Sequence, residues 1–283
     1  MENNNYLSIY AKSFNWAGFF LPKKTYSKCS DLYNFCRTLD NIADDEGKTD
    51  TKLRRFLNFK NNFINQEFEN PIIKNMWSLI NQYNISIKIV NDLFDGVESD
   101  IQSKVELKSK KELLIYSYRV AGTVGLMMAK ILDVTNSNSL KSAIDLGIAM
   151  QLTNISRDVI EDSRNKRFYI THDFEIIKQT LATADSFYDS SFSSIKDIPL
   201  NFRFSILVAR RVYRQIGRNI MKKQTIQNYN QSGKIFVSNI GKILQTILSI
   251  YDLLKLSLIK KHNHLRDKEH SLINEEINLN ERL

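Results

Sequence analysis

Residues 154–162 read NISRDVIED, and residues 40–45 read DNIADD. Each stretch places two aspartates four positions apart: Asp40 with Asp44, and Asp158 with Asp162. In an α-helix this spacing puts both carboxylates on one face, one turn apart. Such pairs repel each other, and aspartate is a poor residue for a helix interior. Mg²⁺ takes one or two protein carboxylates and fills its other positions with water and phosphate oxygens. The pattern therefore predicts two helices whose four aspartates together bind Mg²⁺ or Mn²⁺.

The sequence around both acidic stretches has the apolar period of a helix. Its apolar residues are Leu32, Phe35, Leu39 and Ile42 in the first stretch, and Ile148, Leu152, Ile155 and Val159 in the second. Three prolines and nine glycines are too few for a many-turned β sandwich or barrel. We therefore expect an all-α protein. Further helices are expected at roughly 52–68, 72–82, 86–101, 110–132, 138–163, 174–188, 201–223 and 234–258.

No linker divides the chain, so we expect one helical domain over residues 1–259. Residues 260–283 are dense in charge and lack an apolar stripe, which favours a mobile tail. The sequence has no run of about 18 uncharged apolar residues, and residues 1–10 lack the apolar core of a signal peptide. We therefore expect a cytoplasmic protein whose contact with a membrane is peripheral.

The net charge of +9 indicates an anionic partner. Because the basic residues are spread along the chain and no nucleic-acid-binding motif is present, we do not expect nucleic acid to be that partner. A phosphorylated substrate and an anionic membrane surface remain. Cys29 and Cys36 lie seven positions apart, as buried thiols on one helix would. The four histidines show no triad or zinc spacing, and the sequence assigns them no role.

Three further features have two readings each. Arg37 and Arg157 lie within the acidic helices and offer a planar fork to diphosphate oxygens, or they form ordinary ion pairs. Residues 120–125, VAGTVG, place two glycines in a helical pattern, which fits a kink or close ligand approach as well as tight helix packing. Phe14 belongs to an aromatic cluster that fits either a core or the stabilisation of a carbocation.

Four segments resemble, in the right order, motifs of the squalene/phytoene synthase family, the head-to-head prenyl synthases. They are Ser13-Phe14 with Leu21-Pro22, similar to an SF…LP segment; residues 32–44, similar to YxxCRxxDDxxD; residues 116–125, similar to YxxxVAGTVG; and residues 151–169, similar to QxxNIxRDxxxD followed by a basic residue and tyrosine. Four ordered motifs over most of the chain are far more specific than any single pair of aspartates.

The resemblance implies a single-domain class I terpenoid (isoprenoid) synthase fold with a central cavity and a Mg²⁺-diphosphate site at its mouth. By the same resemblance, the metal is held by Asp40, Asp44, Asp158 and Asp162. The implied contacts with diphosphate or substrate are Tyr33, Arg37, Arg157, Gln151, Asn154 and Phe14, with Tyr116 and Tyr213 facing the reaction intermediate. Lys234 stands where many members carry arginine, and it keeps the charge without the planar fork.

Residues 198–217 and 234–243 look more like bacterial phytoene synthases than squalene synthases. We therefore expect a prenyltransferase of the 15-cis-phytoene synthase type. It would join two geranylgeranyl diphosphates through prephytoene diphosphate, the first step of carotenoid biosynthesis, without NADPH. The alternatives are a squalene or presqualene-diphosphate synthase using farnesyl diphosphate, and a non-catalytic relative acting as an assembly or binding protein. The intact aspartate pairs argue against the non-catalytic alternative.

Overall fold

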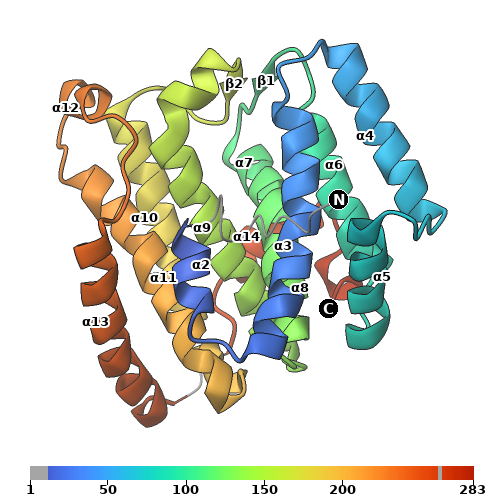
Figure 1. The fold of residues 1–283 in the computed structure, drawn as a ribbon. Helices are drawn as coiled ribbons and strands as arrows, with labels where there is room; N and C mark the ends of the chain where they lie inside the picture. Colours follow the sequence, from blue (N-terminus) through green and yellow to red (C-terminus); the bar gives the residue numbers. More distant parts are fainter. Residues whose placement is uncertain (1–11, 261–262) are drawn as a thin grey trace.

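The computed structural model describes residues 12–260 and 263–283, and these form a bundle of helices (Figure 1). The helices of the first half are α2 (Lys12–Gly18), α3 (Lys23–Asp44), α4 (Thr49–Ile64), α5 (Pro71–Tyr83), α6 (Ile87–Ser99), α7 (Lys110–Ser117) and α8 (Thr123–Ile131). Those of the second half are α9 (Ser137–Arg164), α10 (Phe174–Ser191), α11 (Leu200–Met221), α12 (Ile226–Gln231), α13 (Asn239–Leu258) and α14 (Asp267–Asn274). The prediction of an all-α fold is confirmed.

Helix starts follow from local capping chemistry. Pro71 opens α5 behind Asn70, whose side chain accepts a hydrogen bond from the backbone of Ile72 at 3.0 Å. Asn136 caps the 28-residue helix α9 by accepting from the backbone N–H of Ser139 at 3.2 Å. These side chains satisfy amide groups that have no partner within the helix, so they fix where each helix begins.

Two short strands interrupt the helical pattern. Strands β1 (Val105–Glu106) and β2 (Arg167–Phe168) pair in parallel, with Val105 opposite Arg167. The backbone N–H of Val105 donates to the carbonyl of Lys166 at 3.0 Å. This contact ties the loop after α9 to the loop after α6, and it thereby fixes the backbone of Arg167.

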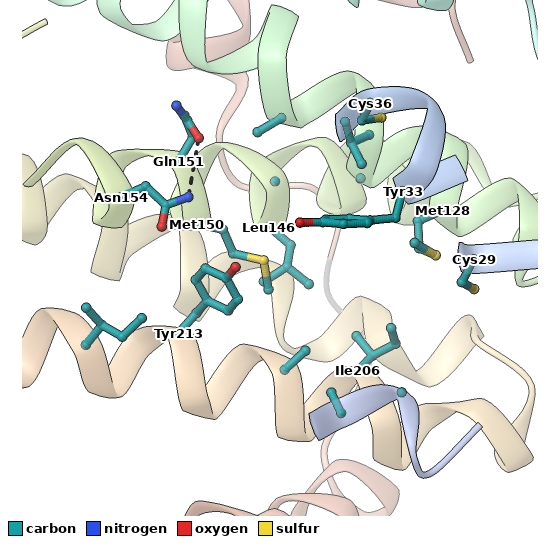
Figure 2. Close-up of a pocket in the computed structure, with 18 of the residues that line it drawn as sticks. Cys29, Tyr33, Cys36, Met128, Leu146, Met150, Gln151, Asn154, Ile206 and Tyr213 are labelled. Carbon is teal, nitrogen blue, oxygen red and sulfur yellow. Dashed lines mark hydrogen bonds between the residues drawn. The ribbon is translucent and has the colours of Figure 1, made fainter. Parts of the chain in front are cut away.

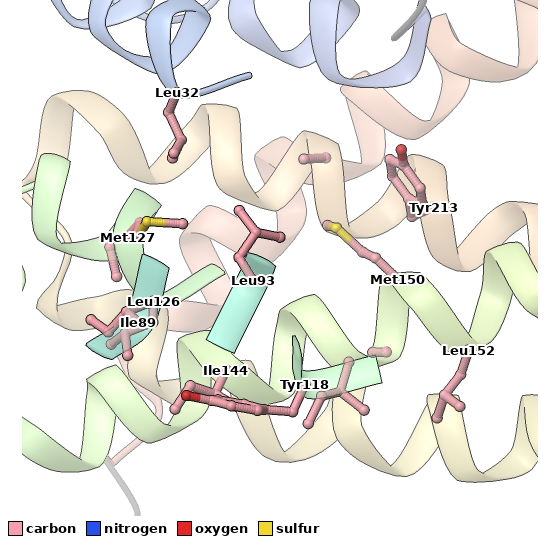
Figure 3. Close-up of a cluster of buried hydrophobic side chains, with 14 of the residues drawn as sticks. Leu32, Ile89, Leu93, Tyr118, Leu126, Met127, Ile144, Met150, Leu152 and Tyr213 are labelled. Atoms are coloured by element: carbon pink, nitrogen blue, oxygen red, sulfur yellow. The ribbon is translucent and has the colours of Figure 1, made fainter. Parts of the chain in front are cut away.

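Helix α9 runs through the middle of the bundle and packs against α8, α10 and α11. Figure 3 shows the core that it shares with the N-terminal half, where Ile144 and Leu152 of α9 lie with Leu126 of α8 and Leu93 of α6. All four side chains are buried. Burying a side chain of this size stabilises the fold by about 1.5–3 kcal/mol, so this shared core sets the position of α9.

The expected helix over residues 110–132 is divided by a π-helical turn, Tyr118–Gly122, between α7 and α8. Tight packing and a local break in the α-helix are both present in the VAGTVG segment, while close approach of a ligand stays a prediction. A Cβ at Gly125 would lie 2.3 Å from the carbonyl oxygen of Ala143, which is the mark of tight packing. Val124 and Gly125 also line a large cavity. A Cβ at Gly147 on α9 would likewise lie 2.3 Å from the carbonyl oxygen of Ala121.

The segment after residue 262, expected to form a mobile tail, instead packs on the bundle. Helix α14 contacts α7, and the side chains of Ile273 and Leu279 are buried. Arg282 donates from Nε and Nη2 to the two carboxylate oxygens of Asp92 at 2.9 and 3.0 Å. The sequence interpretation failed because the apolar side chains of this segment are few and widely spaced among charges. They are nevertheless enough to anchor it, since they pack on an existing core and Arg282 binds the buried carboxylate of Asp92.

No helix of residues 12–260 and 263–283 is long and apolar enough to span a bilayer. Phe14 lies within α2, but its side chain is outside the part of the structure that is described.

Replacing Gly147 with alanine should lower the stability of the protein. The new methyl group would meet backbone that cannot rotate away, and such overpacking typically costs about 1–3 kcal/mol. Over most of that range the cost exceeds the gain of about 1 kcal/mol in helix propensity, and contact with the backbone of two residues places Gly147 toward the upper part. Thermal unfolding followed by circular dichroism should show a midpoint lower by several degrees. Gly47→Ala is the matched control, because a Cβ there meets nothing within 4 Å. A Gly147→Ala protein as stable as the wild type would contradict the packing argument.

Candidate functional site

A cavity of about 1310 Å³ opens between α3, α8, α9 and α11. Its interior is lined by apolar and sulfur-bearing side chains, among them Cys29 of α3, Met128 of α8, Leu146 and Met150 of α9, and Ile206 of α11 (Figure 2). Burial raises the pKa of the Cys29 thiol to about 12, so this thiol is neutral. The interior therefore offers a large and mostly uncharged space to a ligand.

The four paired aspartates all line this cavity. Asp40 and Asp44 lie in the last turns of α3, and Asp158 and Asp162 lie in the last turns of α9. The ends of two helices that are distant in the sequence thus bring both pairs to one end of the cavity. This is the arrangement that the spacing of the aspartates predicted, and it makes that end strongly acidic.

The carboxylates of this acidic end raise one another's pKa. The pKa of Asp40 is raised to about 7, first by burial and then by the negative charge of Asp44. The side chain of Asp40 is 49% accessible because it faces the cavity, yet the cavity walls surround it and limit its solvation. Burial and the charge of Asp158 raise the pKa of Asp162 to about 7. A divalent cation would relieve this repulsion, so the donor set fits Mg²⁺ or Mn²⁺.

Basic side chains surround the same carboxylates. Arg157 donates from Nε to Oδ1 of Asp158 at 2.8 Å, and Nζ of Lys234 lies 3.6 Å from the same oxygen. On α3, Nη1 of Arg37 lies 4.0 Å from Oδ2 of Asp40. All three basic residues line the cavity. Because each already reaches the acidic end, each is within range of an anionic group bound there.

Arg167 connects the first aspartate pair to a carboxylate that the sequence analysis missed. It donates from Nη1 to Oδ1 of Asp44 at 2.7 Å and from Nη2 to the carbonyl oxygen of Asp100 at 3.4 Å. The side chain of Asp100 accepts from the hydroxyls of Tyr116 and Tyr169, each at 2.7 Å. Burial raises the pKa of Asp100 to about 6, against the lowering effect of Arg167 and the two tyrosines. The polar sequence around Asp100 gave no sign that its carboxylate would be enclosed.

Tyr116 lies behind the acidic end and does not line the cavity that the described residues enclose. Its ring stacks on Tyr169 with centroids 4.6 Å apart, and its hydroxyl lies 3.0 Å from the hydroxyl of that residue. The expected contact of Tyr116 with a reaction intermediate therefore has no support in this geometry. Its position indicates that Tyr116 holds Asp100 in place, because the hydroxyl is committed to that carboxylate.

The remaining expected residues lie along the cavity wall. Tyr33 of α3 and Tyr213 of α11 project toward the same space from opposite sides, as Figure 2 shows. Gln151 accepts a long hydrogen bond of 3.5 Å from Nδ2 of Asn154. Oδ1 of Asn154 is buried and has no hydrogen-bond partner in the described parts of the chain. A buried acceptor of this kind is costly unless a ligand satisfies it.

This arrangement fits one class of ligand. The acidic end with its basic rim suits a phosphate group bound through a cation, while the interior suits a long hydrocarbon chain. The cavity also exceeds the range of roughly 300–1,000 Å³ that is usual for drug-sized ligands. It therefore has room for an extended molecule, or for two.

Residues 8–174 match the family model described as squalene/phytoene synthase. The chain belongs to the squalene/phytoene synthase family. This confirms the resemblance that the four sequence motifs carried. The roles of individual residues remain predictions, which rest on their places in the cavity.

Several curated relatives are named phytoene synthases. The chain is 28% identical to a phytoene synthase of Pseudescherichia vulneris, a match that covers 73% of this chain and 77% of that protein. It is 26% identical to a 15-cis-phytoene synthase of Pantoea ananas, over 75% and 79% of the two chains. It is 36% identical to a 15-cis-phytoene synthase of Paracoccus, but that match spans only 46% of this chain and about half, 49%, of the relative.

Solved structures share the fold. A dehydrosqualene synthase in complex with a ligand superposes with a TM-score of 0.70 at 25% identity, over 88% of this chain and 94% of that one. A squalene synthase from Alicyclobacillus acidocaldarius superposes with a TM-score of 0.63 at 17% identity, over 79% and 91% of the two chains. The predicted class I terpenoid synthase fold with a single domain is therefore confirmed.

Proposed function

We propose that this protein is a phytoene synthase that joins two geranylgeranyl diphosphates head to head. The observation that carries the proposal is the cavity, which has four paired carboxylates at one end and a large apolar interior. The relatives named phytoene synthases, mostly bacterial, support the choice within the family. The reaction would proceed through prephytoene diphosphate and supply the first intermediate of carotenoid biosynthesis.

At the acidic end, Asp40, Asp44, Asp158 and Asp162 would hold Mg²⁺. When bound, the ion would supply positive charge against the carboxylates and the diphosphate leaving group. Arg157 and Lys234 would turn from Asp158 toward the diphosphate oxygens, with Arg157 offering two parallel hydrogen bonds. Charge stabilisation by groups that are already in position is commonly the largest catalytic contribution.

The interior would protect the allylic cation that remains after diphosphate leaves. Water would quench that cation, and the apolar lining near Leu146 and Met150 would keep it away. The ring faces of Tyr33 and Tyr213 can stabilise positive charge through the aromatic quadrupole. The double bond of the second substrate would then attack this cation, and loss of a proton would give the cyclopropyl compound prephytoene diphosphate. Departure of its diphosphate, rearrangement of the resulting cation and loss of a second proton would give phytoene. No hydride donor is needed in this scheme.

The alternative within the family is a squalene or presqualene-diphosphate synthase that uses farnesyl diphosphate. The observation in favour of this alternative is that the fold superposes on that of a dehydrosqualene synthase. Both alternatives share the metal site and differ in the chain length of the donor. Experiments on the metal and on the donor therefore test different parts of the proposal.

Activity should require a divalent cation and both aspartate pairs. Asp40→Asn or Asp158→Asn should lower turnover by about two to three orders of magnitude, the range seen when a preset charge-stabilising group is removed. EDTA should silence the wild type, and Mg²⁺ or Mn²⁺ should restore it. Asp95→Asn, at an exposed position on α6, is the matched control. Near-normal turnover of either site variant, with its helical circular dichroism intact, would refute the metal assignment.

The product should form from the C20 donor without a reductant. With geranylgeranyl diphosphate, Mg²⁺ and no NADPH, we expect a C40 hydrocarbon whose central conjugated triene absorbs in the near ultraviolet. The reason is that phytoene formation ends with loss of a proton, whereas squalene formation needs hydride. A cyclopropyl diphosphate that advances only after NADPH is added would favour the squalene alternative. A clear preference for the C15 donor would also count against phytoene synthase.

We also propose that the outer face of α13 docks on an anionic membrane. This helix lies at the edge of the bundle (Figure 1). Its polar side chains face the bundle and its apolar side chains face outward, the opposite of the usual arrangement. Its inner face is polar: Gln245, Ser249 and Asp252 are buried, and Arg211 of α11 donates to Asp252 at 2.7 Å. Its outer face exposes Ile240, Ile243, Leu244, Ile247, Ile250, Tyr251, Leu254 and Leu258.

Charge and position favour a lipid surface as the partner of this face. Lys255 and Lys260 are exposed beside it, and the whole chain carries a net charge of +9. Phe236 and Val237, just before α13, line the cavity, so the apolar face begins beside the space where a hydrocarbon product would form. Basic residues near an anionic leaflet contribute about 1 kcal/mol each, and apolar side chains add more when they insert.

The protein should float with anionic vesicles at low salt and be released by high salt, which screens the lysines. Ile247→Asn with Leu254→Asn should weaken binding at least about tenfold, because each inserted side chain contributes on the order of 1.5–3 kcal/mol. Leu57→Asn with Ile64→Asn is the matched control, since both are exposed on α4. Absent flotation, or binding that salt does not loosen, would refute the proposal. A dimer that the α13 substitutions dissociate would assign the face to a second copy.

A further inference from the structure

Two histidines of the C-terminal segment meet one carboxylate of α9 inside the fold. The side chain of Asp145 is fully buried, and those of His264 and His270 are only 3% and 4% accessible. Nε2 of His264 lies 2.9 Å from Oδ2 of Asp145, and Nε2 of His270 lies 2.7 Å from Oδ1. The two imidazole rings are 4.2 Å apart between centroids. One potential ligand atom from each residue therefore falls within 4.8 Å of the other two.

The donor atoms of this cluster fit a zinc site. Imidazole nitrogen and carboxylate oxygen are both ordinary ligands of Zn²⁺. Behind the cluster, Nδ1 of His264 lies 3.0 Å from Oδ1 of Asp267. A carboxylate on the far nitrogen of a ligating histidine fixes the tautomer and the ring orientation, and such partners usually accompany metal-bound histidines. Asp267 therefore aims Nε2 of His264 at Asp145.

Charge balance also favours a cation. His264 lies between the carboxylates of Asp145 and Asp267, and hydrogen bonding to both requires it to be an imidazolium ion. A divalent cation at Nε2 would let both histidines be neutral and would compensate the buried charge of Asp145. In a tetrahedral site with zinc bonds of about 2.0–2.1 Å, neighbouring ligand atoms lie about 3.3 Å apart. If Asp145 binds through Oδ2, the 2.9 Å between that oxygen and Nε2 of His264 would need to widen by only about 0.4 Å to reach it.

We propose that Asp145, His264 and His270 bind one Zn²⁺ ion, with water in the fourth position, and that this ion fastens the C-terminal segment to α9. The site is separate from the acidic end of the cavity. Asp145 precedes Asp158 by thirteen residues on the same helix, which is a rise of about 20 Å. Asp145 is not part of the cavity lining, although its neighbour Leu146 is. The ion would thus be structural and would not take part in the prenyl transfer.

The test measures zinc in the full chain, without an affinity tag and in the Asp158→Asn background, which weakens metal uptake at the cavity. After EDTA treatment and reloading, mass spectrometry of the metal should find roughly one zinc per chain, because a three-residue site with a supporting carboxylate retains a single ion. His264→Gln and His270→Gln should lose it. His172→Gln should keep it, because His172 lies elsewhere and bonds to Asn230. Zinc should also raise the thermal midpoint only where the site is intact.

Co²⁺ provides a readout that needs no substitution in the site. Bound in place of zinc, it should give the visible absorption band of a four-coordinate site, and added zinc should abolish that band. A protein that retains less than about a tenth of an equivalent of zinc and shows no such band would overturn the proposal. Equal uptake by the His270→Gln protein would overturn it as well. In either case the cluster would be a hydrogen-bonded anchor alone.

Discussion

The mutual repulsion of the carboxylates at the end of the cavity is the constraint that the rest of the fold must satisfy. Asp40 and Asp162 come from different helices, and the pKa of each is raised to about 7 by burial and by a neighbouring aspartate. Held together without a cation, such groups lower the stability of the folded state at neutral pH, because ionising them costs more than it does in water. Arg167 offsets part of that cost through its hydrogen bond to Asp44. The remainder must come from packing elsewhere in the bundle.

Helix α9 supplies much of that packing. Near its middle, Gly147 admits the backbone of Ala121 so closely that no side chain fits between them. Buried residues such as Ile144 and Leu152 lock the same helix into the shared core. With its middle fixed in this way, the last turns of α9 present Asp158 and Asp162 to the cavity, and the hydroxyl of Tyr229 supports them by donating to the carbonyls of Ser156 and Arg157 at 3.0 and 2.9 Å. A rigid element that carries ligands at one end is what a preorganised metal site requires, because loose ligands would relax away from one another.

The sequence predicts those parts of the molecule that depend on short-range pattern. Two aspartates one turn apart reveal their common face, and apolar periodicity reveals most helices to within a few residues. It could not reveal Asp100, because that carboxylate is enclosed only when strand β2 and the rings of Tyr116 and Tyr169 come together around it. The packing of the C-terminal segment on the bundle could not be predicted for the same reason. His264 and His270 have no recognisable spacing until α9 places Asp145 between them, more than a hundred residues earlier in the chain.

Helix α13 turns its polar side toward the bundle because α11 places the charge of Arg211 against it. Arg211 of α11 projects toward α13, so the facing side of that helix must supply Asp252 and Gln245 and must remain polar. The apolar residues of α13 are then forced outward, where water solvates them poorly. A large exposed apolar face is uncommon on a monomeric soluble protein unless something covers it. The same face begins just after Val237, which lines the cavity, so the cavity lining and the outer apolar surface adjoin at the start of α13.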